Sequence, residues 1–118
     1  MEFQIIFFKE ADGKSPIEEF LLGLVKTNKD LFNEASKGIE KLKHRVYHRE
    51  PLSKYLESGL WELRIKSGTN ILRIVFTFYK GQLIILLHIF IKKQQKTPAN
   101  ELEVARKRLK ELKERLLL

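Results

Sequence analysis

Three runs of apolar residues in the middle of the chain predict three β-strands. They cover residues 60–66, 71–79 and 83–91 and are rich in leucine, aromatic and β-branched side chains. The two breaks between them are short and each contains a glycine, so hairpin turns fit there, whereas a helical crossover needs about a dozen residues or more. We therefore expect a three-stranded antiparallel meander. The apolar segment 2–8 predicts one more strand, which joins the same sheet.

Three other segments show the spacing of amphipathic helices. The first opens with Ser15 as a capping residue, Pro16 in the first turn and Glu18 three positions after the cap. The second begins near residue 28 or 30, and the third begins at residues 97–98, again a capping residue followed by proline. The apolar stripes consist of Ile17, Phe20, Leu21 and Leu24, then Leu31, Ala35, Ile39, Leu42 and Val46, and finally Leu102, Ala105, Leu109, Leu112 and Leu116.

Together these elements predict a single α+β domain over residues 1–118. Its four-stranded sheet is antiparallel in the meander and mixed through the N-terminal strand, and it is covered by two N-terminal helices plus a C-terminal helix. The stripe of the last helix fits packing against the sheet or against a partner helix. A chain of 118 residues can bury about 65% of its unfolded surface, which is enough for a core without disulfides.

Composition narrows the classes of function. The chain has no cysteine, which excludes disulfides and thiolate chemistry. The N-terminal apolar run is only four residues long, too short for a signal sequence or a membrane span. We therefore expect a cytoplasmic protein without a membrane partner.

Charge is distributed unevenly along the chain. The formal net charge is +8, and residues 1–59 hold ten basic and ten acidic side chains, whereas residues 60–118 hold thirteen and five. An excess confined to the predicted meander and the last helix favours a polyanionic partner such as a nucleic acid. The alternative is an ordinary solvated, lysine-rich surface, since small soluble domains often carry a net charge of this size.

Cations set into the apolar strands are the first candidates for function. Alternation places Arg64 and Lys66 side by side on one face of the first meander strand. Arg73 lies in a strand that is otherwise apolar on both faces, where an unpaired charge would cost several kcal/mol. It must therefore pair with an acid such as Glu62 or bind an anion, and both possibilities stay open.

Histidines and a basic cluster supply weaker signals. His88 is the only ionisable residue in its strand, which is more typical of a hydrogen-bonded core histidine than of a catalyst. His44 and His48 have a spacing that suits a metal ion, but no carboxylate pair lies near them, which favours a plain basic helix end. An aromatic residue is followed by three lysines at Phe90, Lys92, Lys93 and Lys96. This pattern can bind single-stranded RNA by base stacking and phosphate contacts.

Four sequence blocks stand out in order along the chain. They read KSPIEEFL at 14–21, GLWELRIK at 59–66, LRIVF at 72–76 and LHIFIKKQQKTPANEL at 87–102. In these blocks the chain resembles the phage-derived Gp49-like/HigB proteins of the RelE/ParE superfamily. The resemblance implies a small RelE-like fold and the toxin of a type II toxin–antitoxin pair. It also implies a ribosome-dependent endoribonuclease that cuts mRNA in the ribosomal A site and forms a hetero-oligomer with a helix-turn-helix, HigA-like antitoxin.

By the same resemblance, the basic catalytic positions of the superfamily fall on Arg64, Lys66, Arg73 and Lys93. The RNA 2′-hydroxyl attacks its own 3′-phosphate in such enzymes, so we predict no metal and no cofactor. Arg73 is assigned to clamp the scissile phosphate, Lys66 to act as a base with a pKa lowered by neighbouring cations, and Lys93 to stabilise the developing negative charge. Contacts to RNA are assigned to Phe90, Lys92, Lys96 and His88.

One departure from the family concerns the general acid. Many RelE-like enzymes carry a tyrosine, or a histidine with an aspartate, near the C-terminus of the sheet, and residues 94–100 offer neither. Lys93, His88 or a ribosomal group remain as the proton donor. The second hypothesis is therefore a non-catalytic basic module that binds nucleic acid or docks an antitoxin.

Overall fold

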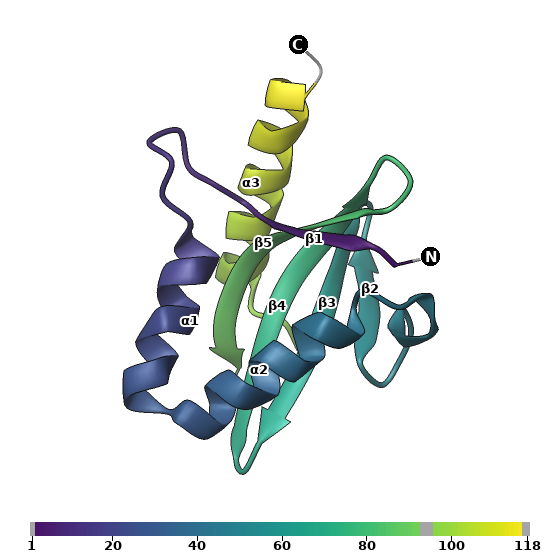
Figure 1. The fold of residues 1–118 in the computed structure, drawn as a ribbon. Helices are drawn as coiled ribbons and strands as arrows, with labels where there is room; N and C mark the ends of the chain where they lie inside the picture. The colour runs from purple at the N-terminus through teal and green to yellow at the C-terminus, as the bar shows by residue number, and fades with distance from the viewer. Residues whose placement is uncertain (1, 93–95, 117–118) are drawn as a thin grey trace.

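The predicted meander forms the centre of the structure, a computed structural model that describes residues 2–92 and 96–116 (Figure 1). It consists of β3 (Leu60–Ser67), β4 (Asn70–Tyr79) and β5 (Leu83–Lys92), joined by two short turns. Gly68 and Gly81 have φ angles of 60° and 69° in those turns. Because a side chain is strained in this region of φ and glycine is not, the two glycines fix where each hairpin turns.

Two further strands extend the sheet to five, in the order β1-β5-β4-β3-β2. β1 (Gln4–Phe7) pairs parallel with β5, and β2 (Ser53–Glu57) pairs antiparallel with β3. The α+β class and the mixed sheet joined by the N-terminal strand are thus confirmed. β2 adds a fifth strand to the predicted four, because its sequence SKYLE is short and partly exposed and its strand form depends on pairing with β3.

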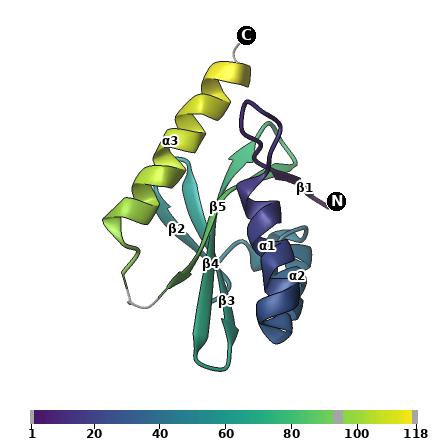
Figure 2. The same cartoon turned by 90° about the vertical axis from the view of Figure 1, so that its left-hand side faces the viewer.

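Helices cover both faces of the sheet and give the three layers seen in Figure 2. α1 (Pro16–Thr27) and α2 (Lys29–Lys41) pack on one face, and α3 (Ala99–Leu116) packs on the other. The predicted start of α1 is confirmed, because the Ser15 hydroxyl accepts a hydrogen bond from the backbone N–H of Glu18. In the described part of the chain, every helix is too short or too polar to cross a lipid bilayer.

The main core lies between the sheet and the pair α1 and α2. α2 approaches β3 so closely that a Cβ atom on Gly38 would come within 3.1 Å of Ile65 Cγ1. The opposite face receives Ala105 and Leu109 of α3, which are both buried. The last helix therefore packs against its own sheet, which was one of the two predicted arrangements.

The segment between α2 and β2 differs from the prediction. α2 ends at Lys41, and the chain continues through a 3₁₀ helix, η1 (Arg45–Tyr47). Val46 is therefore 58% exposed and does not extend the apolar stripe of α2. His44 and His48 do not share a helical face, and His48 Nε2 instead donates to a backbone carbonyl at 2.6 Å. No group of three potential metal ligands is present within residues 2–92 and 96–116.

Candidate functional site

On the α3 face, strand register brings charged residues of three strands into adjacent rows. Arg64 on β3 lies directly opposite Arg73 on β4, which lies opposite Phe90 on β5. Residues opposite one another in an antiparallel sheet point to the same face and contact each other. The register thus places two guanidinium groups side by side. The rows that flank this pair consist of Glu62, Val75 and His88 on one side and of Lys66, Ile71 and Lys92 on the other.

Glu62 is the centre of this charged group. Its side chain is completely buried, and its Oε1 accepts a hydrogen bond of 2.5 Å from Arg73 Nη1. Its Oε2 accepts a bond of 2.7 Å from the Thr97 hydroxyl, which ties the segment before α3 to the sheet. Arg64 Nε lies 3.7 Å from the same carboxylate. The ion pair between Arg73 and Glu62 that the sequence left open is therefore formed, and it offsets the cost of burying both charges.

Positive charge outnumbers negative charge around Glu62. Lys92 is only 4% exposed, and burial lowers the pKa of its ammonium group below its usual range. The charges of Arg73, Arg64 and Lys54 shift this pKa in the same direction, and Glu62 shifts it upward. Within the described residues, the Nε atoms of Arg64 and Arg73 are buried without a hydrogen-bond acceptor. We refer to Arg64, Arg73 and Lys92 as the cation cluster, in which these two Nε atoms are the donors that an anion could satisfy.

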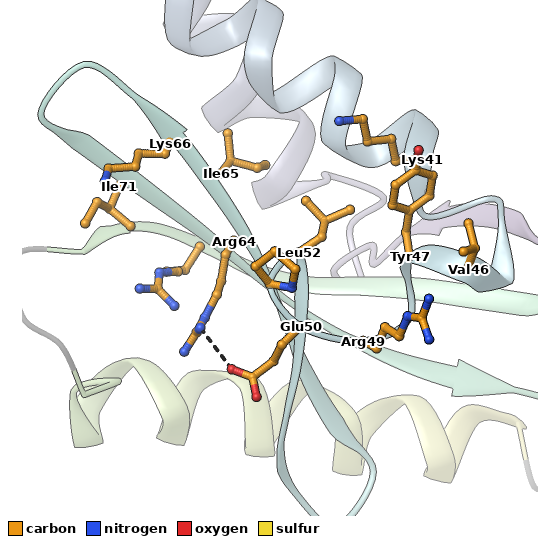
Figure 3. Close-up of a pocket in the computed structure, with 12 residues that line it drawn as sticks. Lys41, Val46, Tyr47, Arg49, Glu50, Leu52, Arg64, Ile65, Lys66 and Ile71 are labelled. Atoms are coloured by element: carbon orange, nitrogen blue, oxygen red, sulfur yellow. Dashed lines mark hydrogen bonds and ion pairs between the residues drawn. The ribbon is translucent and has the colours of Figure 1, made fainter.

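A cleft of about 700 Å³ opens beside Arg64 and Arg73, at the edge of β3 (Figure 3). It lies where the segment after α2 folds back along the sheet, so that the backbone N–H of Arg64 donates to the carbonyl oxygen of Leu52 at 2.8 Å. We refer to it as the edge cleft. Its basic lining residues are Lys41, Arg49, Arg64, Lys66 and Arg73. Its apolar and aromatic lining residues are Val46, Tyr47, Pro51, Leu52, Ile65 and Ile71.

Glu50 also lines the edge cleft and contacts Arg64 from the solvent side. Its Oε1 lies 3.4 Å from Arg64 Nη1, as the dashed line in Figure 3 shows. Because its side chain is 65% exposed, this ion pair contributes little to stability. Arg64 is therefore bracketed by two carboxylates, the buried one of Glu62 and an exposed one that an incoming anion can displace.

A second, smaller hollow of about 210 Å³ shares Arg64 with the edge cleft. Its lining includes Lys54, Lys92 and Lys96 together with the buried Glu62. Four basic side chains thus meet around one carboxylate. Both hollows are positively charged, and Arg64 lies between them.

The predicted site residues are only partly brought together. Arg64, Lys66 and Arg73 line the edge cleft, and Lys92 and Lys96 line the smaller hollow. The two hollows adjoin, because Arg64 lines both of them. The structure thus brings cations from separate elements close to one another, while their catalytic roles stay predictions.

The predicted catalytic lysines differ in their surroundings. Lys66 is exposed near the end of β3, whereas Lys92, predicted only as an RNA contact, is buried among cations. The crowded environment expected for Lys66 is thus found at Lys92. Lys93 lies outside the described residues.

Phe90 and His88, the predicted RNA contacts on β5, are packed between the sheet and α3. Their rings stack with centroids 5.5 Å apart, and Phe90 is only 5% exposed. His88 Nε2 donates to Glu101 Oε1 at 2.8 Å, and its Nδ1 accepts from Arg108 Nη1 at 3.3 Å. Burial lowers the pKa of His88, Arg108 shifts it in the same direction, and Glu101 shifts it upward. His88 thus fits the predicted core histidine, and Phe90 lacks the open ring face that base stacking needs.

Sequence reasoning missed the far wall of the edge cleft. Lys41, Tyr47 and Arg49 belong to the end of α2 and the segment after it, where the apolar stripe predicted that the helix continues to Val46. The density of basic residues between 41 and 49 was a signal. Only the fold-back of this segment against β3 makes it part of the site, and that contact is tertiary.

A family model for the phage-derived Gp49-like proteins matches residues 19–110. This range runs from within α1 into α3. It contains every residue of the cation cluster and of the edge cleft. Comparison with curated proteins found no match.

Proposed function

The chain belongs to the phage-derived Gp49-like protein family, and from this premise we propose that it is the toxin of a type II toxin–antitoxin pair. In this proposal it acts as a ribosome-dependent mRNA endoribonuclease of the RelE type. Family membership is consistent with such a toxin and with a nuclease-type activity. The observation that carries the proposal is the pair of adjacent arginines, Arg64 and Arg73, beside a positively charged cleft.

RNA cleavage by its own 2′-hydroxyl needs three contributions from the site. A base removes the 2′-hydroxyl proton, cations stabilise the negative charge on the pentavalent phosphorus, and an acid protonates the departing 5′-oxygen. The bond between the 2′-oxygen and phosphorus forms, and the bond between phosphorus and the 5′-oxygen breaks. The products are therefore a 2′,3′-cyclic phosphate and a 5′-hydroxyl.

Arg64 and Arg73 supply the charge stabilisation in this proposal. A guanidinium group presents its N–H donors in a planar fork that matches two phosphate oxygens. The bond of 2.5 Å from Arg73 to Glu62 fixes the orientation of that side chain before the substrate arrives. Little reorganisation is then needed as charge develops. Glu62 is thus a positioning residue, and Arg73 clamps the scissile phosphate.

Lys92 is the residue that we propose for proton transfer. Burial among cations lowers its pKa, which raises the fraction of neutral amine able to take the 2′-hydroxyl proton. The exposed Lys66 contacts the RNA backbone instead. Because both ring nitrogens of His88 are engaged, the proton for the 5′-oxygen comes from Lys93 or from a ribosomal group.

The partners in this proposal are the ribosome, with its mRNA and rRNA, and a helix-turn-helix antitoxin of the HigA type in a hetero-oligomer. The surplus of basic residues in the second half of the chain supports contact with RNA, since phosphate neutralisation dominates such binding. Activity on translating ribosomes requires a cytoplasmic protein.

The proposal is tested by adding the protein to a translation reaction that contains one defined mRNA. New 5′ ends are mapped by primer extension with and without ribosomes, and the matching 3′ ends are examined for a cyclic phosphate. We expect ribosome-dependent ends at codon boundaries, each with a cyclic phosphate on the upstream fragment. Intact mRNA and undisturbed translation would overturn the proposal.

A binding module without catalysis is the second candidate function. It is favoured by the engagement of His88 with Glu101 and Arg108, which removes an imidazole from the set of free proton donors. This candidate predicts RNA binding that weakens with salt, with a log–log slope of about −0.7 for each phosphate contact. No cleavage products would then appear on translating ribosomes.

A further inference from the structure

We propose that the edge cleft holds the nucleotide next to the scissile phosphate, with the base of that nucleotide against Tyr47 and its own phosphate near Lys41 and Arg49. This inference rests on the proposed function and adds to it a base-binding subsite on the segment after α2. Three features lead to it: the size of the cleft, the order of its charged and apolar surfaces, and the anchoring of the backbone that carries Tyr47.

The edge cleft has the size and lining of a small-molecule site. Its volume of about 700 Å³ falls within the range of roughly 300–1,000 Å³ that is typical of such sites. In Figure 3, Tyr47 stands on one side and Ile71 on the other, with Leu52 and Ile65 between them. Tyr47 is 37% exposed. A planar base can therefore lie over apolar side chains and contact an aromatic ring.

Cations flank this apolar surface on two sides. Arg64 lies on one side of it, and Lys41 and Arg49 lie on the side of the 3₁₀ segment (Figure 3). Arg73, opposite Arg64 in the sheet, also lines the cleft. A single RNA strand presents the complementary order of phosphate, base and phosphate. Aromatic side chains flanked by basic ones are a common means of binding it. The order of surfaces thus matches one nucleotide step of RNA.

The backbone that carries Tyr47 is held in place by its neighbours. The backbone N–H of Tyr47 donates to the carbonyl oxygen of His44 at 3.1 Å, and its own carbonyl accepts from the Ser53 hydroxyl at 2.7 Å. Lys41 Nζ lies 5.6 Å from the ring centroid, a distance at which a cation and an aromatic ring attract each other. Because the backbone position of Tyr47 is already fixed, little backbone freedom is lost when a base packs against its ring.

The arrangement favours RNA over an acidic peptide as the occupant. Arg64 and Arg73 belong to the cation cluster and also line the edge cleft, so the strand whose phosphate is cut continues directly into it. Glu50 already contacts Arg64 at 3.4 Å from the solvent side, and a phosphate can take over this contact. An acidic peptide would neutralise the cations but would leave the flat aromatic surface unused.

Tyr47→Leu tests the subsite, and Tyr79→Leu is its matched control. Tyr79 also has a lysine over its ring, with Lys80 Nζ at 5.4 Å from the centroid, but it is the last residue of β4, far along the strand from Arg73. Cleavage of defined A-site codons is measured at low and at saturating protein. We expect Tyr47→Leu to lower cleavage about tenfold at low concentration and to flatten the ranking of codons, and Tyr47→Phe to restore both. Tyr79→Leu should match the wild type.

Binding of a short single-stranded RNA with a 2′-deoxy sugar at the cut site separates this inference from the proposed function. We expect Tyr47→Leu to weaken that binding about tenfold. If Tyr47→Leu weakens binding in this way but the wild-type protein never cleaves mRNA, the proposed endoribonuclease activity is overturned and the subsite stands. If the wild type cleaves and a folded Tyr47→Leu protein equals it in both assays, the subsite is overturned and the endoribonuclease stands. The subsite would also be overturned if the protein bound a polyglutamate peptide in a Tyr47-dependent way but did not bind RNA. It would likewise be overturned if the protein bound neither.

Discussion

The two faces of the central sheet are made by alternate residues of the same strands, yet they differ in chemistry. Toward α2, β3 and β4 present Leu63, Ile65 and Leu72, none of which is more than 4% exposed. Toward α3, the same strands present Glu62 at 0% and Arg73 at 7% exposure. Burial is thus similar on both faces, but its consequence differs. A buried leucine stabilises the fold by itself, whereas a buried arginine does so only with its partner.

The charged face keeps its residues buried because its innermost charges are paired, so the domain has both a charged site and an apolar core. On the α3 face, Glu62 accepts hydrogen bonds from both Arg73 and Thr97, so the innermost charges are paired and their orientation is fixed. The pair between Arg64 and Glu50 lies at the cleft and is exposed. The inner pair therefore holds the site together, and the outer pair can exchange with a ligand.

Removal of Glu62 is expected to have the largest effect on stability. Glu62→Leu leaves Arg73 buried without its acceptor and releases Thr97, so the free energy of unfolding should fall by about 3–5 kcal/mol. Urea unfolding followed by circular dichroism measures the change. The double variant Glu62→Leu/Arg73→Met makes the charged face resemble the apolar one, and it should regain most of the stability without cleaving mRNA. A single variant as stable as the wild type would show that this pair does not anchor the α3 face.

Leu63→Ala is the corresponding change on the apolar face. Leu63 is completely buried, and the cavity left behind should lower the free energy of unfolding by about 3 kcal/mol. RNA affinity per folded molecule should remain within about twofold of wild type, because the cation cluster lies on the other face. Fluorescence anisotropy with a labelled RNA checks this below the unfolding transition. A large loss of affinity in fully folded protein would argue against the separation of the two faces.

Acidification should weaken the contact of α3 with the sheet. His88 lies between Glu101 and Arg108, and burial lowers its pKa below the ordinary value of 6.5 although Glu101 shifts it upward. Between the folded pKa and 6.5, the unfolded chain binds more protons than the folded one, so stability falls as the pH drops through this window. Melting temperatures recorded across it should decline for the wild type and stay flatter for His88→Gln. Parallel curves for the two proteins would exclude His88 as the pH-sensitive contact.

Glu50→Gln should have the smallest effect. It removes the exposed carboxylate at 3.4 Å from Arg64, so single-stranded RNA should bind about two- to fivefold more tightly while stability changes by less than about 0.5 kcal/mol. Glu34→Gln is the matched control, because Glu34 forms a comparable exposed pair with Lys37 at 3.5 Å on α2. Equal gains in affinity from both variants would mean that net charge, and not the cleft, controls binding.

Much of the fold could be predicted because its signals are local. The meander strands and the start of α1 carry their apolar period, turn glycines and caps within their own sequences. β2 could not be predicted, since SKYLE is a strand only through its pairing with β3. In the sequence, the apolar stripe of α2 continues to Val46, but in the structure the helix ends at Lys41 and the chain turns along the sheet edge.

The candidate site was predictable only where single residues are unusual for their surroundings. Arg64 and Arg73 stand out as cations in apolar strands, but their position opposite each other depends on the hairpin register. The burial of Phe90 depends on α3, which packs over that face from the far end of the chain. Tyr47 joins the cleft only through the fold-back after α2. Tertiary contacts thus decide which of the candidate side chains can meet a ligand.

Whether the charged face of the sheet carries the reaction is tested by comparing single-turnover mRNA cleavage on programmed ribosomes by the wild type, Arg73→Met and Leu63→Ala. Urea unfolding is measured first, so that each rate refers to folded protein. We expect a loss of about 100-fold or more for Arg73→Met and a rate within about twofold of wild type for Leu63→Ala. Wild-type cleavage by folded Arg73→Met would contradict the assignment of the reaction to the charged face of the sheet.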